Sequence, residues 1–448
     1  MPHHKTSLER PHALVNRRQF IRAAGLAGAG AALAGPFISP TRAAANEKLN
    51  IAVIGVAGRG GENLKEVAAL ENIVALCDVD STRLAGAAQK FPAAKTYSDF
   101  RRLIDQKDID AILVATPDHT HAVATAAALA SGRHVYCEKP LTHTVSEARI
   151  ITDLARKTGL VTQIGTQIHA GNNYRRVVEL VQSGAIGTVR EVHVWAGAVY
   201  GGHDAPKERP PVPKELDWDL WLGPVKEHPY HPDFCHFKWR NWWHFGGGSL
   251  ADFGCHFMDL PFWALGLKYP TSVEPVSGPP VHPESTPPWL IVRYEFPERK
   301  NGSIKVPLPA LKLTWYHGGR KPENILPEEF LKKWGGGVLF VGENGMLISD
   351  YGKHALLPEE KFKEFQRPKE FIPNSIGHHK EWTQAIKSGG KTTCPFEYSG
   401  PLTEAALLGN VAYRVGKKLE WDAKALRATN CPEAEQLVQH HYRAGWRI

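Results

Sequence analysis

A strand that runs directly into a glycine-rich turn and then a helix constrains the fold of this 448-residue chain more than any other segment. Residues 49–54 (LNIAVI) are rich in aliphatic side chains, which is typical of a strand buried on both faces of a parallel sheet. Gly55, Gly58 and Gly60 follow, and a helical pattern opens at residue 62. Glycines let the backbone approach a pyrophosphate, whose charge the N–H groups of a helix N-terminus stabilise. The segment predicts a dinucleotide-binding turn, in which Gly58 replaces the usual middle glycine because Ala57 stands there.

An acidic residue follows the next predicted strand. Residues 72–77 (NIVALC) predict that strand, and Asp78 comes about twenty residues after the turn, where a ribose-binding acid is expected. A carboxylate there accepts hydrogen bonds from ribose hydroxyls and repels a 2′-phosphate, so Asp78 favours NAD. The neighbouring Arg83 leaves NADP as the less favoured cofactor. The structural alternative for Asp78 is a turn residue without a ligand.

Two further strands end in side chains that can carry chemistry. The strand predicted at 111–115 stops at the motif TPDHTH (residues 116–121), and the strand predicted at 134–137 stops at Glu138, Lys139 and Pro140. The carboxyl ends of parallel strands share one edge of the sheet, where α/β proteins bind ligands. A lysine at that edge can handle a proton. Taken alone, the Glu-Lys pair favours a surface salt bridge, but the upstream turn reverses that preference.

The second half of the chain has a polar helix face of its own. Residues 246–259 (GGGSLADFGCHFMD) predict a flexible turn followed by a helix with Asp252, His256 and Asp259 at positions i, i+4 and i+7. These three side chains would share one face, and the rest of the helix is apolar. The structural alternative is a buried hydrogen-bond network that ties the helix to a sheet.

The order of these motifs resembles the glucose-fructose oxidoreductase, inositol dehydrogenase and rhizopine catabolism family, named Gfo/Idh/MocA. The resemblance covers nearly all of the chain beyond residue 45. It implies an α/β fold in two domains. Residues 46–166 would form a Rossmann domain with a doubly wound parallel sheet. Residues 167–448 would form a substrate-binding α/β domain with an open, mostly antiparallel sheet and C-terminal helices.

The resemblance also implies roles for particular residues. Lys139, His256 and Asp252 are the expected catalytic residues, with His256 as acid/base and Asp252 holding its tautomer, while Asp259 is a supporting residue. Asp252 and His256 are also expected to bind the substrate. The expected cofactor-binding residues lie along the strand ends: Gly55, Gly58, Arg59, Gly60, Asp78, Thr116, Pro117, His121, Glu138, Lys139 and Gln167.

Candidate substrate-binding residues flank this machinery. Residues 218–245 are rich in aromatic side chains, and we expect Trp239, Trp242 and Trp243 to offer flat faces to the C–H side of a sugar. The alternative is an aromatic core under a long loop. Polar groups between the domains are candidates with equally ordinary capping or surface roles: His169, Asn172 and Arg176.

No metal site is predicted. The aromatic segment holds four histidines, but no carboxylate or cysteine spacing near them resembles a zinc motif. The four are His228, His231, His236 and His244. The six cysteines of the chain are too few and too scattered for a disulfide scaffold.

The first 45 residues predict an export signal rather than part of the fold. Arg17 and Arg18 form a twin-arginine pattern, followed by a mildly apolar stretch and a small-residue cleavage signal near Ala45. We therefore expect export to the periplasm without membrane insertion after cleavage. The segment holds six Lys and Arg and one acid, so its removal lowers the formal net charge from +8 to +3. That charge gives no reason to expect nucleic acid as a partner.

The sequence predicts an NAD-dependent oxidoreductase that acts on a secondary hydroxyl of a sugar or glycoside, with a tightly bound, internally recycled cofactor. Two alternatives remain open. One is an NAD-dependent glycosidase or lyase that cleaves glycosides through a 3-keto intermediate, and the other is a non-catalytic sugar-binding protein. We also expect a homo-oligomer that forms through the C-terminal sheet.

Overall fold

The computed structural model describes residues 47–300, 302, 304, 306–439 and 441–448. The predicted twin-arginine signal and its cleavage site lie outside the described residues.

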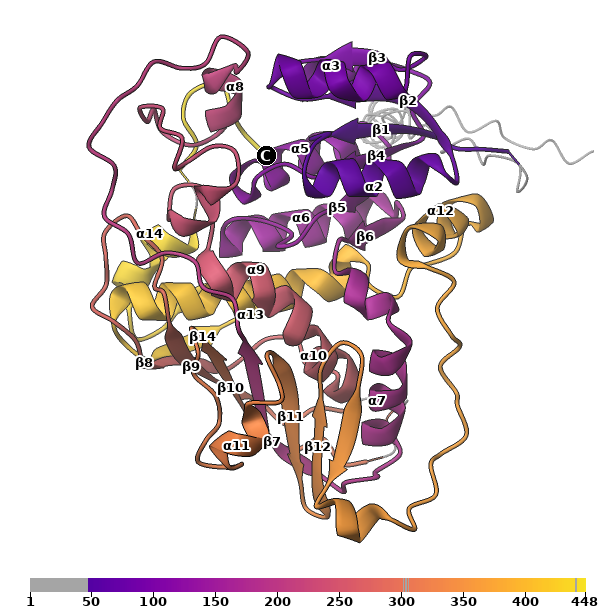
Figure 1. The fold of residues 1–448 in the computed structure, drawn as a ribbon, viewed down its shortest axis with the longest axis vertical. Helices are drawn as coiled ribbons and strands as arrows, with labels where there is room; N and C mark the ends of the chain where they lie inside the picture. The colour runs from indigo at the N-terminus through magenta and orange to yellow at the C-terminus, as the bar shows by residue number, and fades with distance from the viewer. Residues whose placement is uncertain (1–46, 301, 303, 305, 440) are drawn as a thin grey trace, which may run out of the picture. The chain divides into compact units, whose positions relative to one another are not determined.

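The first sheet has six parallel strands in the order β3-β2-β1-β4-β5-β6 (Figure 1). This order reverses at β1 and β4, as in a doubly wound dinucleotide-binding sheet, so the predicted Rossmann architecture is confirmed. The strands are β1 (Asn50–Ile54), β2 (Asn72–Cys77), β3 (Lys95–Tyr97), β4 (Ala111–Val114), β5 (His134–Cys137) and β6 (Thr162–Ile164).

Helices cover both faces of this sheet because its central strands are apolar on both sides. Side chains that alternate along β1 enter different cores: Ile51 and Val53 pack with α2, α3 and α12, whereas Ala52 and Ile54 pack with α5 and α6. The helices are α2 (Arg59–Ala68), α3 (Ser81–Lys90), α4 (Phe100–Leu103), α5 (Asp118–Ala130), α6 (Val145–Thr158) and α12 (His378–Ser388).

The second sheet has nine strands in the order β13-β12-β11-β7-β10-β9-β8-β14-β15. Only the β7–β10 pair is parallel, so the predicted open and mostly antiparallel sheet is confirmed. The strands are β7 (Val189–Ala196), β8 (Ser272–Ser277), β9 (Leu290–Phe296), β10 (Leu311–His317), β11 (Gly337–Gly342), β12 (Gly345–Ser349), β13 (His354–Leu357), β14 (Leu419–Asp422) and β15 (Arg427–Ala428).

Helix α13 (Phe396–Val415) joins the two halves of the fold, because it contacts α6 on one side and α9 and β8 on the other (Figure 1). Nearly all of its residues are buried. The Arg149 guanidinium of α6 donates from Nε and Nη2 to the two Glu404 carboxylate oxygens of α13, each at 2.8 Å. The remaining α-helices are α7 (Asn172–Gln182), α8 (Trp218–Leu222), α9 (Gly248–Phe257), α10 (Asp259–Leu265), α11 (Glu328–Leu331) and α14 (Glu435–Val438).

The helix predicted to carry Asp252, His256 and Asp259 is divided. Helix α9 ends at Phe257, and α10 begins at Asp259. Pro261 explains the break, because proline has no N–H for the carbonyl four residues earlier and its ring clashes with that carbonyl. Asp259 therefore leaves the face that Asp252 and His256 share.

All six cysteines lie in the described part of the chain, where they are buried with free thiols. Among the described helices, none combines the length and the apolar character that crossing a membrane requires.

Candidate active site

A cavity of about 610 Å³ lies at the carboxyl ends of the first sheet and reaches the loops of the second domain. The first sheet supplies residues that follow each of its six strands, and the second domain supplies α9 and the aromatic loop. Of the residues expected to bind cofactor or carry catalysis, the lining includes Gly55, Gly58, Arg59, Asp78, Thr116, Pro117, Glu138, Lys139, Gln167 and His256.

The turn after β1 leaves room for a ligand. Gly55 has φ +86°, and a Cβ there would lie 2.5 Å from the Ala115 carbonyl oxygen, so only glycine fits. A Cβ on Gly60 would lie 2.0 Å from the Gly55 carbonyl oxygen. Gly58 caps α2 with φ +55° and lines the cavity, and a Cβ there would meet nothing within 4 Å. The open space at a helix N-terminus fits a pyrophosphate.

The Asp78 carboxylate is fixed at the end of β2. Its Oδ2 accepts a hydrogen bond from the Val56 N–H at 3.0 Å, and its Oδ1 accepts one from the Asp80 N–H at 3.0 Å. Burial raises the pKa of Asp78, and these two N–H groups act in the opposite direction. Arg83 lines the same end of the cavity. Asp78 lines the cavity at the strand end where the sequence predicts ribose binding.

The Glu138 carboxylate organises the end of β5. Its Oε1 accepts hydrogen bonds from the Asn63 amide at 2.8 Å and the Gln167 amide at 2.7 Å, and Arg59 Nε lies 3.3 Å away. A Cβ on Gly165 would lie 2.5 Å from the Glu138 carboxyl carbon, so the backbone after β6 packs closely against this side chain. Glu138 thus ties the turn after β1 to the edge that presents Lys139.

Lys139 and Asp252 meet across the two halves of the fold. Lys139 Nζ forms an ion pair with Asp252 Oδ1, and Arg240 Nε lies 3.4 Å from the same oxygen. Burial alone would raise the pKa of Asp252, but the charges of Lys139 and Arg240 outweigh burial and lower it to about 2. The carboxylate is therefore ionised, and it holds the lysine ammonium at the cavity.

His256 lies one helical turn beyond Asp252 on α9 and lines the same cavity. Burial and the Lys139 charge lower its pKa to about 3, so the imidazole is neutral near pH 7. Its Nδ1 is buried and has no hydrogen-bond partner among the described residues. The prediction that Asp252 holds the His256 tautomer differs from this geometry, because the bonds of Asp252 go to Lys139 and Arg240 instead.

Comparison with known protein families decides which fold family this geometry belongs to. The model of an oxidoreductase family's NAD-binding Rossmann fold, GFO_IDH_MocA, matches residues 49–166. The model of the same family's C-terminal alpha/beta domain matches residues 171–303. Together they cover more than half of the chain. The chain belongs to the Gfo/Idh/MocA oxidoreductase family. The first sheet and its helices therefore form an NAD-binding Rossmann domain.

Individual proteins are similar to this chain over part or most of its length. Inositol 2-dehydrogenase of Salmonella typhimurium is 29% identical over 185 residues, which are 39% of this chain and 54% of that protein. The chain thus spans about half the length of such curated relatives. The aldose-aldose oxidoreductase of Caulobacter crescentus is 19% identical with a TM-score of 0.53, over 84% of this chain and 100% of that one. A levoglucosan dehydrogenase in complex with NADH and levoglucosan is 17% identical with a TM-score of 0.53, over 83% and 99%.

Several residues predicted for the site do not line the cavity but lie behind its wall. His121 is buried, and its ring nitrogens lie 2.7 Å from the Pro140 carbonyl oxygen and 2.8 Å from the Thr116 carbonyl oxygen. It therefore joins two cavity-lining turns. His169 Nδ1 lies 2.9 Å from Asp259 Oδ1, and its ring stacks on Trp263 at 4.1 Å. His169 and Asp259 form a buried pair that is absent from the lining.

The polar residues predicted at the start of α7 also face other partners. Asn172 Oδ1 accepts a hydrogen bond from the Ser375 N–H at 3.0 Å, and Arg176 Nε lies 3.0 Å from Glu179 Oε2. Both side chains hold the segment that leads from the second sheet to α12, since Arg176 also donates from Nη2 to the Ile372 carbonyl. Neither lines the cavity.

Of the three tryptophans predicted to bind sugar, one lines the cavity wall and two lie in the core of the second domain. Trp239 lines the cavity, and the Arg240 guanidinium lies over its ring at 4.0 Å. Trp242 is 2% exposed and donates from Nε1 to the Asp233 carbonyl at 2.8 Å. Trp243 is buried and donates from Nε1 to the His282 carbonyl at 3.2 Å. The geometry leaves only Trp239 in position for a sugar platform, because the other two rings pack inside the domain.

Arg240 and Asp118 are charged cavity residues that were not predicted from the sequence. Arg240 bridges Asp252 and Trp239, and it was visible only as part of the aromatic segment. Asp118 begins α5, lines the cavity and is 2% exposed, and its Oδ1 has no hydrogen-bond partner in the described part of the chain. Burial raises the pKa of Asp118 well above its usual value, although Arg240 acts against that shift. Its place in the motif TPDHTH was the available signal.

Proposed function

We propose that this protein is an NAD-dependent oxidoreductase that oxidises and reduces a secondary hydroxyl of a sugar, polyol or glycoside. The observation that carries the proposal is the Lys139–Asp252 ion pair, which joins the Rossmann edge to α9 beside His256. When bound, NAD would accept a hydride from the carbon that carries the hydroxyl. The names of the relatives, inositol 2-dehydrogenase, aldose-aldose oxidoreductase and levoglucosan dehydrogenase, support a hydroxylated ring as substrate.

The residues at the cavity orient the hydroxyl group, accept its proton and pack against the sugar ring. The Lys139 ammonium donates a hydrogen bond that orients the hydroxyl, and Asp252 keeps that ammonium in place. Neutral His256 accepts the hydroxyl proton. Because its pKa is about 3, His256 is unprotonated near pH 7 and its ring is available to accept that proton. Trp239 and Arg240 form the wall against which the sugar ring packs.

NAD is favoured over NADP by the Asp78 carboxylate at the end of β2. Its two backbone hydrogen bonds leave it fixed at the cavity, where a 2′-phosphate would meet a second negative charge. The cofactor-binding residues proposed are those of the turn after β1 and of the strand ends, with Glu138 and Gln167 as the supporting pair.

Tight retention of the cofactor is supported by the C-terminal segment, residues 441–448. Trp446 lines the cavity with its ring centroid 6.0 Å from that of Phe100, and Arg101 lies over the Trp446 ring at 4.5 Å. Arg443 anchors the segment by donating from Nε to the Gly223 carbonyl at 2.6 Å. A cofactor enclosed in this way would be recycled in place by a second sugar.

Cleavage of a glycoside is the second candidate, and Asp118 favours it. A keto group made by hydride transfer acidifies the neighbouring C–H, and loss of that proton allows elimination of a leaving group. Elimination needs an acid near the leaving oxygen, and Asp118, whose pKa burial raises, can supply it. Return of the hydride then makes the net reaction redox-neutral.

The proposal includes export and self-association. The twin-arginine pattern at Arg17 and Arg18 supports transport of the folded, cofactor-loaded protein to the periplasm. The open second sheet supports a homo-oligomer, which sedimentation of the purified chain would test.

Analysis of the purified protein tests the function. Denaturation followed by mass spectrometry should release NAD. Incubation of the native protein with myo-inositol, levoglucosan and free aldoses should give a keto product that lacks two hydrogens. A protein that releases no dinucleotide and forms no product would be a sugar-binding protein instead.

A further inference from the structure

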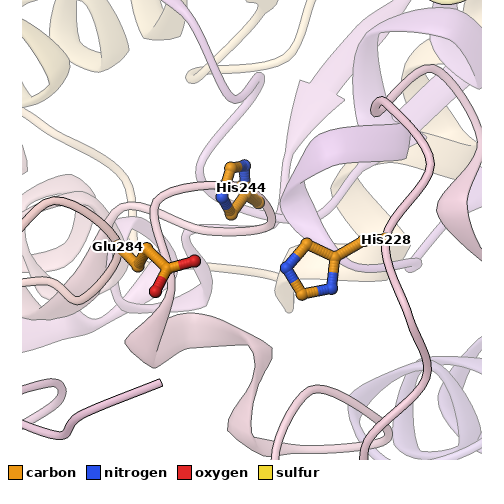
Figure 2. Close-up of side chains that lie close together, drawn as sticks. All are labelled: His228, His244 and Glu284. Atoms are coloured by element: carbon orange, nitrogen blue, oxygen red, sulfur yellow. The ribbon is translucent and has the colours of Figure 1, made fainter. Parts of the chain in front are cut away.

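We propose that His228, His244 and Glu284 form a binding site for a divalent transition-metal ion, for which Zn²⁺ has the best-matched chemistry. One ligand atom from each residue lies within 4.8 Å of the other two. The two imidazole rings and the carboxylate point toward a common space between separate loop segments (Figure 2). The site lies outside the cavity lining and does not depend on the proposed function.

The donor set selects the kind of ion. Two imidazoles and one carboxylate are the protein ligands of one common class of zinc centre, in which water takes the fourth position. Ligand atoms of a tetrahedral zinc centre lie about 3.4 Å apart, so the loops would close slightly around the ion. Ca²⁺ and Mg²⁺ need six or more oxygen ligands, which one carboxylate does not supply.

The ligands are positioned before any ion arrives. His228 Nδ1 lies 3.0 Å from the Pro229 carbonyl oxygen, so that nitrogen can carry the proton and Nε2 can present its lone pair. The Trp218 indole donates to the His228 carbonyl at 2.7 Å, which anchors the loop. The Phe234 ring stands edge-on to the His228 imidazole at 4.7 Å.

The other two ligands are held by paired backbone. Trp242 and Ser285 form an antiparallel bridge, and the Trp243 N–H donates to the Glu284 carbonyl at 2.9 Å. His244 and Glu284 therefore sit on adjacent, strand-like segments. His244 is exposed, which gives an ion a path from solvent.

An ion here would join three segments that support the cavity wall. His228 and His244 flank the aromatic loop that contributes Phe237, Trp239 and Arg240 to the cavity. Glu284 lies in the segment between β8 and β9. Cross-linking these segments would stiffen the wall on which the substrate packs. The site was invisible to spacing rules because the carboxylate lies forty residues beyond His244 in the sequence.

Metal content measures the site directly. The full chain, purified without a histidine tag, is stripped with a chelator, dialysed against ZnCl₂ and analysed for zinc per chain. We expect one equivalent of zinc and a thermal unfolding midpoint that rises by a few degrees with Zn²⁺ but not with Ca²⁺. Substitution of Co²⁺ should give the visible absorption of a tetrahedral site.

Two variants and a matched control make the test specific. His244→Ala and Glu284→Gln should each lose the zinc equivalent and the thermal shift, and each should keep the circular dichroism of the wild type. His203→Ala removes an exposed histidine of a neighbouring loop and should keep both. The proposal is overturned if the wild type binds no zinc, if either ligand variant keeps the equivalent, or if His203→Ala loses it.

Discussion

At the scale of single residues, the cavity separates two buried carboxyl groups by their surroundings. Lys139 and Arg240 keep Asp252 ionised with a pKa of about 2, whereas burial dominates at Asp118 and raises its pKa well above the usual value. One carboxylate therefore holds a cation, and the other carboxyl can donate a proton. Different environments of this kind assign acid and base roles within one site.

Replacement of each carboxyl group by its amide separates the two roles. Asp252→Asn leaves Lys139 and Arg240 without their anion, and should lower the free energy of unfolding at pH 7 by about 2 kcal/mol, the scale of a pKa lowered by about two units. Burial already raises the pKa of Asp118, so Asp118→Asn removes less charge stabilisation and should cost about 0.5 kcal/mol or less.

Urea unfolding at several pH values measures this difference. The folded-state pKa of Asp252 lies below its unfolded value, so its contribution is fully present above about pH 4 and is lost as the pH falls through about 2. Equal losses of stability in the two variants at pH 7 would show that Asp118 is also ionised.

The lowered pKa of His256 leads to a prediction about how the rate of the reaction depends on pH. Its pKa of about 3 keeps the imidazole neutral above pH 5, so kcat/KM should stay level within about twofold between pH 5 and pH 7 on this account. A histidine base of ordinary pKa would lose about tenfold between pH 7 and pH 5.5. Initial rates on an identified substrate decide the matter. An acid limb near pH 6.5 that disappears in His256→Asn would contradict the assigned environment.

At the scale of elements, the C-terminal segment reaches the far edge of the Rossmann domain. Trp446→Ala removes the ring that packs between Phe100 and Arg101 at the cavity. Loss of these contacts, about 1 kcal/mol or more, should speed the release of bound NAD at least fivefold. Dilution into a dinucleotide scavenger measures the release rate.

Trp289 provides the matched control for that variant. Its ring is covered by Arg320 at 4.4 Å and does not line the cavity. Trp289→Ala should leave NAD release unchanged. Equal release rates in the wild type and Trp446→Ala would mean that the C-terminal segment does not retain the cofactor.

At the scale of the whole molecule, the elements that could be predicted from the sequence are those that a local pattern of apolar residues and turns determines. Strands at 72–77 and 134–137 are confirmed, because apolar runs bounded by turns need no distant information. The glycine turn and the strand-end residues were predictable for the same reason, since parallel strands place their carboxyl ends at one edge.

Contacts between distant residues were not predictable. His169 pairs with Asp259 across ninety residues, and Trp446 returns to Phe100 from the other end of the chain. Trp242 and Trp243 have the composition of a sugar platform, but their indole N–H groups find partners inside the domain. Pro261 was present in the sequence, and its effect on the helix could have been anticipated from its missing N–H.

The proposed export would be a property of the entire precursor. Replacement of Arg17 and Arg18 together by lysine should trap the precursor in the cytoplasm, because the twin-arginine route reads the guanidinium pair. Cell fractionation and N-terminal sequencing of the periplasmic protein check both export and cleavage near Ala45. Undiminished export of the double variant would count against the twin-arginine assignment.

The central claim is that Lys139 and His256 handle the hydroxyl while hydride passes to bound NAD. Rapid mixing of the NAD-loaded protein with a substrate found in the screen, followed by the absorbance of reduced nicotinamide, tests it most directly. Lys139→Met and His256→Asn should each slow reduction about a hundredfold, and the double variant should be little slower than the slower single variant. All variants should keep their NAD, and Lys312→Met, an exposed lysine of β10, should match the wild type. Reduction at the wild-type rate in Lys139→Met or His256→Asn would contradict the account.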